Sequence, residues 1–192
     1  MRTWLSVLGY ILLSFIACQD ATQHREAPAQ VDVMATNTVD SVAIANTLHG
    51  FFIWYDANLE RLGWTRFVDD STGEHLLLNE DKLRGYLDDL RSSGFVSDEL
   101  VIEEAAYYRA CAKKWATEEK DEIPSGLSID RFHCAMDYIA PYPTGKVTAA
   151  IHGDRAHAVL TLTGEHGASY DFKYDLKKED GKWLLAKLGC NL

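Results

Sequence analysis

The sequence predicts an α+β domain in which N-terminal helices pack on one face of a curved antiparallel sheet. In the first half of the chain, apolar residues recur at steps of three and four, which is typical of amphipathic helices. From Val147 onward apolar residues alternate with polar ones, which is typical of antiparallel strands with one exposed face. Because the helices precede the strands instead of alternating with them, an α+β layer arrangement is expected.

The first 17 residues have the pattern of a bacterial signal peptide. Arg2 is followed by the apolar run Trp4–Ile16, which is shorter than the ~20 residues needed to span a bilayer. The run ends in Phe15-Ile16-Ala17-Cys18, which resembles the lipobox of bacterial lipoproteins. We therefore expect acyl chains on Cys18 to anchor the protein in a lipid bilayer. The alternative is an ordinary secreted protein in which Cys18 has no special role.

Residues 18–38 are expected to form a flexible tether between the lipidated Cys18 and a single domain at 39–192. The segment is rich in Ala, Gln, Thr and charged residues and has no aromatic residue. Such a composition buries too little apolar surface to offset its ordering entropy. Gln19 after the cysteine favours the periplasmic face of the outer membrane, with the inner membrane as the alternative.

The chain is strongly acidic. Its formal charge is −10, and removal of residues 1–17, whose only charge is the +1 of Arg2, brings it to −11. This charge argues against a nucleic-acid partner and against adhesion to anionic lipid. It suits a basic protein partner, or solubility alone.

The cysteine content predicts one disulfide. With Cys18 assigned to lipid, the remaining cysteines are Cys111, Cys134 and Cys190. An oxidising compartment favours a bridge, and three thiols allow one bridge and one free thiol. The short intervening loop favours Cys111–Cys134, whereas Cys134–Cys190 would instead fix the C-terminus. No pair has the spacing of a zinc site.

Three helices are predicted. The first spans 39–62 and ends at Gly63. The second begins after Asn79, a natural N-cap, and the third begins after Ser97. Trp64–Leu78, between the first two helices, has the composition of a small irregular hairpin. The apolar face of the first helix comprises Val42, Ala45, Leu48, Phe52, Tyr55, Leu59 and Leu62.

The strands are expected in sequential order after a packed connection at 127–143. Two strands flank a tight turn at Asp154-Arg155, and the third, at 170–176, alternates most regularly. Asp180-Gly181 is a strong hairpin signal that leads into a last strand at 182–189.

Several of these segments together resemble the nuclear-transport-factor-2-like cone fold. They are FFIWYDANL in the first helix, the antiparallel meander and the closing DGKWLLAKL. Within that superfamily, the pattern is similar to an uncharacterised family of bacterial exported domains, the domain of unknown function numbered 3828. The matching residues are Phe52, Trp54, Tyr55, Asp130, Phe132, Cys134, Asp137 and Tyr138. The resemblance covers roughly residues 40–190, and this family brings no established catalytic residues.

The resemblance implies a pocket between the concave face of the sheet and the helices. Aromatic residues that are candidates to line it are Trp54, Tyr55, Tyr107, Tyr138 and Tyr170. For each of them the alternative is ordinary core packing.

Reactive residues give weak signals. Asp130 and Asp137 flank His133 and Cys134, a set that suggests nucleophilic catalysis, but adjacent side chains point in different directions and Cys134 is expected to be bridged. His152 and His157 would be cross-strand neighbours if Asp154-Arg155 is a two-residue loop, and two imidazoles are the minimum of a transition-metal site. Solvated histidines are the alternative. The chain has no Gly-rich phosphate loop, GxSxG or HExxH motif, so we expect no catalytic residue and no cofactor.

These observations predict a non-catalytic, lipid-anchored periplasmic binding domain. Its most specific form is an immunity or inhibitor protein that neutralises a secreted antibacterial toxin or a cell-wall hydrolase. The acidic charge would then steer the domain to a basic enzyme. The alternative is a small-ligand carrier or weak enzyme that uses the cone pocket.

Overall fold

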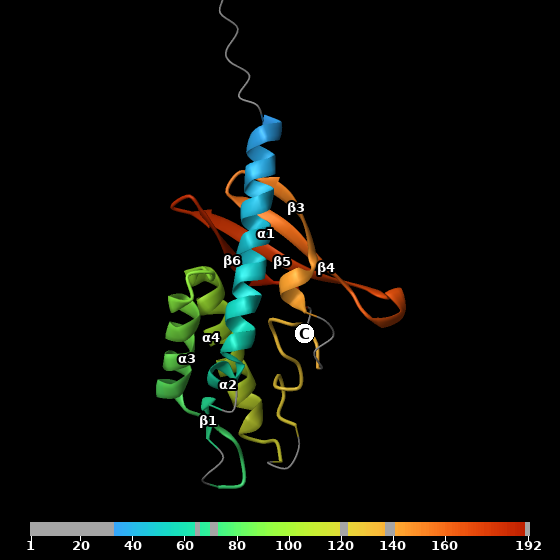
Figure 1. The fold of residues 1–192 in the computed structure, drawn as a ribbon. Helices are drawn as coiled ribbons and strands as arrows, with labels where there is room; N and C mark the ends of the chain where they lie inside the picture. The colour runs from blue at the N-terminus through green and yellow to red at the C-terminus, as the bar shows by residue number, and fades with distance from the viewer. Residues whose placement is uncertain (1–32, 64–65, 70–72, 120–122, 137–140, 191–192) are drawn as a thin grey trace, which may run out of the picture. The chain divides into compact units, whose positions relative to one another are not determined.

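The structure is a computed structural model that describes residues 33–63, 66–69, 73–119, 123–136 and 141–190 (Figure 1). In these residues, helices precede an antiparallel sheet, which confirms the predicted α+β class. The predictions for Cys18, the signal peptide and most of the tether lie outside the described residues.

The first predicted helix is two helices. α1 spans Val33–Ala57, so it begins within the segment expected to be a tether, and α2 spans Leu59–Leu62. The break falls at Asn58, whose backbone leaves the helical region (φ −119°, ψ 10°) while its side-chain Nδ2 donates to the carbonyl of Trp54 at 2.7 Å. An asparagine that bonds local backbone in this way competes with continued helix.

The buried face of α1 differs from the predicted one. Val42 and Leu59 were expected inside but are 56% and 39% exposed. The buried side is rotated away from Val42. Its members are Ile44, Leu48, Phe51, Phe52 and Tyr55.

The next elements follow the sequence closely. β1 (Val68–Asp69) and β2 (Leu77–Leu78) form the predicted small hairpin. α3 (Glu80–Ser92) is capped by Asn79, which accepts from the amide of Lys82 at 3.0 Å. α4 (Asp98–Trp115) is capped by Ser97, which accepts from the amide of Leu100. Both caps confirm the predicted helix starts.

The four-stranded sheet is a simple antiparallel meander in the order β3-β4-β5-β6. Its strands are β3 (Lys146–His152), β4 (Arg155–Thr163), β5 (Ser169–Glu179) and β6 (Lys182–Leu188). Short 3₁₀ turns, η2 (Tyr142–Thr144) and η3 (Glu165–Gly167), precede β3 and β5. Asp180 and Gly181 form the predicted hairpin turn, both with positive φ (48° and 80°), as a type I′ turn requires.

α1 crosses the sheet, and α4 packs between α3 and β6 (Figure 1). Thr47 of α1 donates to the carbonyl of Trp183 in β6 at 2.9 Å. Asp40 accepts from Lys178 Nζ at 2.7 Å and from Trp183 Nε1 at 3.0 Å. These bonds hold the N-terminal half of α1 over the last hairpin.

The segment between α3 and α4 connects the helices to the sheet. The amide of Ser97 donates to the carbonyl of Leu185, and the amide of Leu185 donates to the carbonyl of Phe95, at 2.9 and 2.8 Å. The ring of Phe95 then lies over Gly50 of α1, where an added Cβ would be only 2.7 Å from a ring carbon. Gly50 is therefore required by close packing.

Candidate functional site

The loop 123–136 brings most of the buried polar side chains of the described residues together beneath the C-terminal half of α1. A disulfide between Cys134 and Cys190, with 5.5 Å between their Cα atoms, joins this loop to the chain just after β6. The expected pairing of Cys111 with Cys134 is therefore wrong, and the alternative is the one formed. Cys111 is a free, buried thiol on α4, and it faces Gly126, where an added Cβ would lie 2.3 Å from its sulfur.

Glu104 and Arg131 form a buried ion pair next to the disulfide. Glu104 of α4 is 0% exposed and Arg131 is 6% exposed, and the guanidinium contacts Glu104 Oε1 through Nε and Nη2 at 2.7 and 2.6 Å. The hydroxyl of Tyr86 donates to the other carboxylate oxygen at 3.4 Å. Burial raises the pKa of the Glu104 carboxyl, and Arg131 opposes that rise. Arg131 also lies 3.6 Å from the centre of the Tyr107 ring, a cation–π contact.

His133 lies between two carboxylates. Its Nε2 is 3.0 Å from Asp56 of α1, and its Nδ1 is 3.5 Å from Asp130. Burial acts to lower the pKa of His133, but the hydrogen bond and charge of Asp130, together with Asp56, outweigh it, so the pKa is raised. The two carboxylates therefore favour the charged form of His133.

Asp130 organises the loop. Its Oδ1 accepts from the amides of Phe132 and His133 at 2.9 and 2.8 Å, and its Oδ2 accepts from the Tyr55 hydroxyl at 2.9 Å. Burial acts to raise the pKa of this carboxyl, but the hydrogen bond and charge of His133 outweigh burial and lower it. A carboxylate with this many donors is a fixed anion.

A cleft of about 220 Å³ opens over this cluster, between the α1–α2 end, α3, α4 and the loop. Burial raises the pKa values of three tyrosines that line it, Tyr55, Tyr86 and Tyr108, well above the usual range, so they stay protonated. The Tyr55 and Tyr86 hydroxyls already donate to Asp130 and Glu104. A ligand in the cleft would therefore meet aromatic rings and few unsatisfied polar groups.

The predicted pocket aromatics do not share one pocket in the described residues. Tyr55 lines the cleft, whereas Tyr107 borders a separate hollow beside Cys111. Trp54 packs half-buried against the core with its ring 6.0 Å from Phe51. Tyr170 is 41% exposed near the β4–β5 turn, and Tyr138 lies outside the described residues.

His152 and His157 lie on neighbouring strands but are not directly opposite each other. The turn between β3 and β4 is Gly153-Asp154, one residue earlier than predicted, because His152 pairs with Arg155. The two imidazoles are consequently diagonal, with ring centres 6.4 Å apart, and His157 Nδ1 is hydrogen-bonded to Asp175 at 2.6 Å. Within the described ranges, no group of three or more His, Cys, Asp or Glu is placed to hold a metal ion.

The sequence did not identify the pairing of Glu104 with Arg131, or the role of Asp56. One signal was available: Glu104 falls on the inner, apolar side of α4, between Val101 and Tyr108. A charge at such a position needs a buried partner of opposite sign.

In the part of the chain that the structure describes, no helix combines the length and the apolar character needed to cross a bilayer. The chain matches no protein-family model, no curated protein and no solved structure. The function is therefore inferred from the residues and their geometry.

Proposed function

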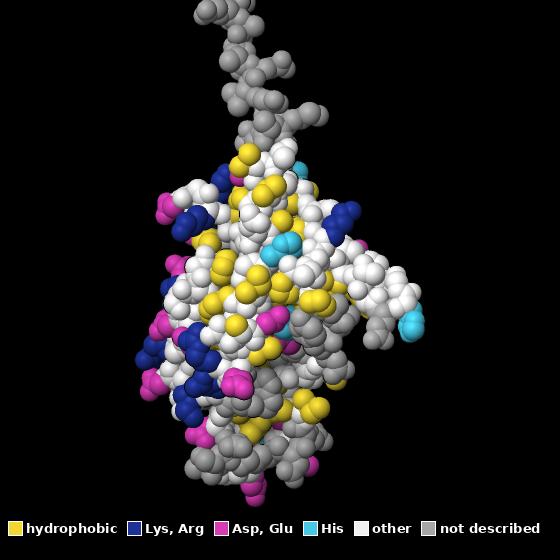
Figure 2. Space-filling view, viewed as in Figure 1, with side chains coloured by type: hydrophobic (Ala, Val, Ile, Leu, Met, Phe, Trp, Pro, Cys, Tyr) yellow, Lys and Arg dark blue, Asp and Glu magenta, His cyan; other side chains and the backbone are white. Residues whose placement is uncertain are grey.

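We propose that this protein is a non-catalytic, lipid-anchored periplasmic binding domain, and most specifically an immunity or inhibitor protein for a secreted toxin or cell-wall hydrolase. The observation that carries the proposal is the outer face of α1. Val39, Val42 and Ile53 are 69%, 56% and 60% exposed on one side of this helix. Figure 2 shows hydrophobic side chains following α1 down the middle of the molecule.

This apolar face has the properties of a protein-binding surface. α1 contains no Lys or Arg, so its outer side offers no cation that a partner would have to desolvate. Exposed apolar side chains that lie on one side of a helix mark a candidate interaction site. Large apolar anchors also supply much of the binding energy at protein interfaces.

The buried polar cluster supports a non-catalytic role. Each buried side-chain nitrogen or oxygen in the described residues has a hydrogen-bond partner. Asp130 contacts His133 and accepts a hydrogen bond from Tyr55, and His133 also contacts Asp56. Glu104 accepts a hydrogen bond from Arg131. Groups engaged in this way stabilise the loop and leave little capacity to act on a substrate.

The partner class follows from charge. A domain of net charge near −11 attracts a basic protein over long range and accelerates its association at low salt. Basic, secreted hydrolases that act on the cell wall fit this description.

The lipid anchor is part of the proposal. The Cys134–Cys190 disulfide is consistent with an exported protein, since such bridges persist in oxidising compartments. Mass spectrometry of the native protein should find a mature N-terminus at Cys18 carrying acyl chains. An unmodified Met1 would contradict the anchor and with it the proposed location at the outer membrane.

We also propose that the fold is a nuclear-transport-factor-2-like cone, related to the exported family numbered 3828. Support comes from the four-stranded meander crossed by a long first helix. An experimental structure that superimposes on such cones over the sheet and α1 would test this assignment.

The binding proposal is tested with exported hydrolases encoded beside the gene. Submicromolar binding and loss of hydrolase activity on cell-wall suspensions are expected. Ile53→Asp should weaken binding about tenfold or more, since it places a charge in the apolar face. The matched control is Ile102→Asp on α4, where the isoleucine is 68% exposed. If no neighbouring product binds, or if both variants weaken binding equally, the proposal is wrong.

A second candidate function, a small-ligand carrier, is favoured by the 220 Å³ cleft lined by Tyr55, Tyr86 and Tyr108. Crystals soaked in mixtures of periplasmic metabolites would then show density in this cleft. A cleft occupied by side chains of the protein itself would rule out the carrier.

A further inference from the structure

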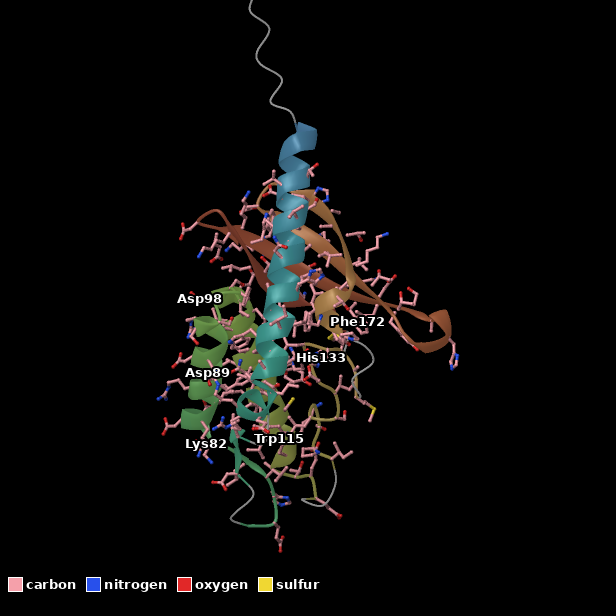
Figure 3. The ribbon with its side chains drawn as sticks, in the orientation of Figure 1. Lys82, Asp89, Asp98, Trp115, His133 and Phe172 are labelled. Carbon is pink, nitrogen blue, oxygen red and sulfur yellow. A yellow bond between two sulfur atoms is a disulfide. The ribbon has the colours of Figure 1, made fainter. Side chains whose placement is uncertain are left out.

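A basic groove between α2 and α3 adjoins the cleft, with which it shares Tyr86. Its volume is about 490 Å³, and its lining residues are Arg61, Arg66, Lys82, Gly85, Tyr86 and Asp89. Three cations face one carboxylate, which gives the lining a net charge of +2 in a chain of net charge −10. Figure 2 shows Lys and Arg side chains gathered over these two helices, and Figure 3 places Lys82 and Asp89 on α3.

Arg61 is neutralised within the groove, whereas Arg66 differs from every other described arginine in having no carboxylate partner. Asp89 is paired with Arg61. Arg66 donates through Nη1 to the carbonyl of Arg61 at 3.0 Å, which holds its side chain beside the groove. Among the described residues, neither Arg66 nor Lys82 is paired with a carboxylate. The other described arginines all have such a partner, namely Asp89 for Arg61, Asp81 for Arg84, Asp88 and Asp98 for Arg91, Glu80 for Arg109, Glu104 for Arg131 and Glu99 for Arg155.

Gly85 gives a second, independent indication. A glycine inside a helix costs roughly 1 kcal/mol relative to alanine, and α3 would accept a larger residue here, because a Cβ at position 85 would have no neighbour within 4 Å. Gly50 of α1, by contrast, is required by the ring of Phe95. Packing within the domain therefore does not explain Gly85. Its effect is to keep the groove open and to expose the α3 backbone beside two unpaired cations.

We propose that this groove binds a phosphate group. Arginine presents a planar fork of N–H donors that matches phosphate oxygens, and lysine adds a mobile point charge. A dianionic phosphate also matches the net charge of +2. The phosphate belongs either to a free phosphorylated molecule or to a lipid headgroup, and both sources present the same oxygens to Arg66 and Lys82.

The test uses the chain from residue 19 onward, which lacks both the apolar run Trp4–Ile16 and Cys18, so that neither a signal peptide nor an acyl chain inserts into vesicles. Inorganic phosphate is titrated while backbone amide shifts are followed by NMR. Saturable shifts centred on Gly85 and Lys82 are expected, and Arg66→Gln combined with Lys82→Gln should weaken binding about tenfold or more. Gly85→Leu should weaken it as well, because it fills the groove without changing the charge.

The matched control is Arg84→Gln, which removes one positive charge from the same helix outside the groove and should leave the affinity unchanged. A second arm uses vesicles of phosphatidylglycerol and phosphatidylcholine. Binding to vesicles that phosphate displaces identifies a headgroup, whereas binding of phosphate alone identifies a free phosphorylated ligand. The proposal is overturned if neither probe binds saturably, or if the groove variants and Arg84→Gln bind like the parent chain.

Discussion

Glu104 of α4 carries its carboxylate inside the protein, where the side chain is 0% exposed. A fully buried carboxylate is tolerated because Arg131 contacts it twice and Tyr86 adds a third bond. The pair lies where α4 meets the loop that also carries the disulfide. Replacing Arg131 or Glu104 alone leaves the charge of the other residue uncompensated in a low-dielectric interior.

Arg131→Met should accordingly lower the free energy of unfolding by roughly 3–5 kcal/mol, because it strands the Glu104 carboxylate. Urea denaturation measures the change. The double variant Arg131→Met with Glu104→Leu should recover most of the loss, since no buried charge remains. A double variant no more stable than Arg131→Met alone would contradict this view of the pair.

His133 should make stability depend on pH. Its folded-state pKa is raised above the ordinary 6.5, so its contribution is complete below that pH and is lost as the pH rises through the folded pKa. The pKa of Asp130 is lowered from 3.8, so its contribution is present above that value and is lost as the pH falls through the folded pKa. The contribution of His133 and Asp130 to the free energy of unfolding should therefore be largest between roughly pH 3.8 and 6.5.

Denaturation midpoints at pH 6 and pH 8.5 measure the effect of His133. The free energy of unfolding should fall across this interval, and His133→Gln should reduce the slope. His152→Gln, at an exposed position on β3, should leave the slope as in the parent chain. Equal slopes for the parent chain and His133→Gln would contradict the prediction.

At the scale of elements, two helical glycines should respond in opposite directions to the same substitution. Gly85→Ala should raise the free energy of unfolding by about 1 kcal/mol, because it improves helix propensity in open space. Gly50→Ala should lower it by about 1 kcal/mol, since overpacking against the Phe95 ring exceeds the propensity gain. Thermal and urea unfolding of the two variants give the comparison, and a loss of stability in both would show that Gly85 is packed after all.

Local signals allowed several elements to be predicted from the sequence. Asn79 and Ser97 predict the starts of α3 and α4, because an N-cap side chain bonds to a backbone amide only three positions further along the chain. Asp180-Gly181 likewise predicts its hairpin locally, because a two-residue turn needs residues that tolerate positive φ. The break at Asn58 was missed because apolar residues continue across it from Tyr55 to Leu62. The early start of α1 was missed because the segment before residue 39 is rich in Ala, Gln, Thr and charged residues and gives no helical pattern of apolar residues.

The candidate site was harder to predict because its partners are distant in sequence. Glu104 and Arg131 are 27 positions apart, and Asp56 and His133 are 77 apart. No periodicity relates such positions. The basic groove likewise combines Arg61 and Arg66 with Lys82 from another helix.

For the whole molecule, the disulfide is a covalent constraint that joins positions 56 residues apart. The shorter loop between the two cysteines favoured Cys111–Cys134 in the sequence. However, the entropic cost of closing a loop rises by only about 0.6 kcal/mol for each doubling of its length, so loop length is a weak guide to pairing. The fold decides instead: Cys111 is buried on α4 against Gly126, whereas Cys190, just after β6, lies next to Cys134 in the loop.

Peptide mapping without reduction should therefore join Cys134 to Cys190 and leave Cys111 free. The bridge spans 56 positions, so its removal by Cys134→Ala with Cys190→Ala should cost about 4 kcal/mol in the chain-entropy treatment. Cys111→Ala is the control and should cost less, since it removes only one buried sulfur. A Cys111–Cys134 peptide would contradict the observed pairing.

The two hydrogen bonds between Phe95, Ser97 and Leu185 have a consequence for self-association. They occupy part of the outer margin of β6 with a segment of the same chain, so a foreign polypeptide cannot add there as a neighbouring strand. Within the four-stranded sheet, the edge that remains open to main-chain pairing with another chain is β3, on the opposite margin. Ala150→Pro, in the middle of that strand, is the first substitution to test for protection against fibril formation.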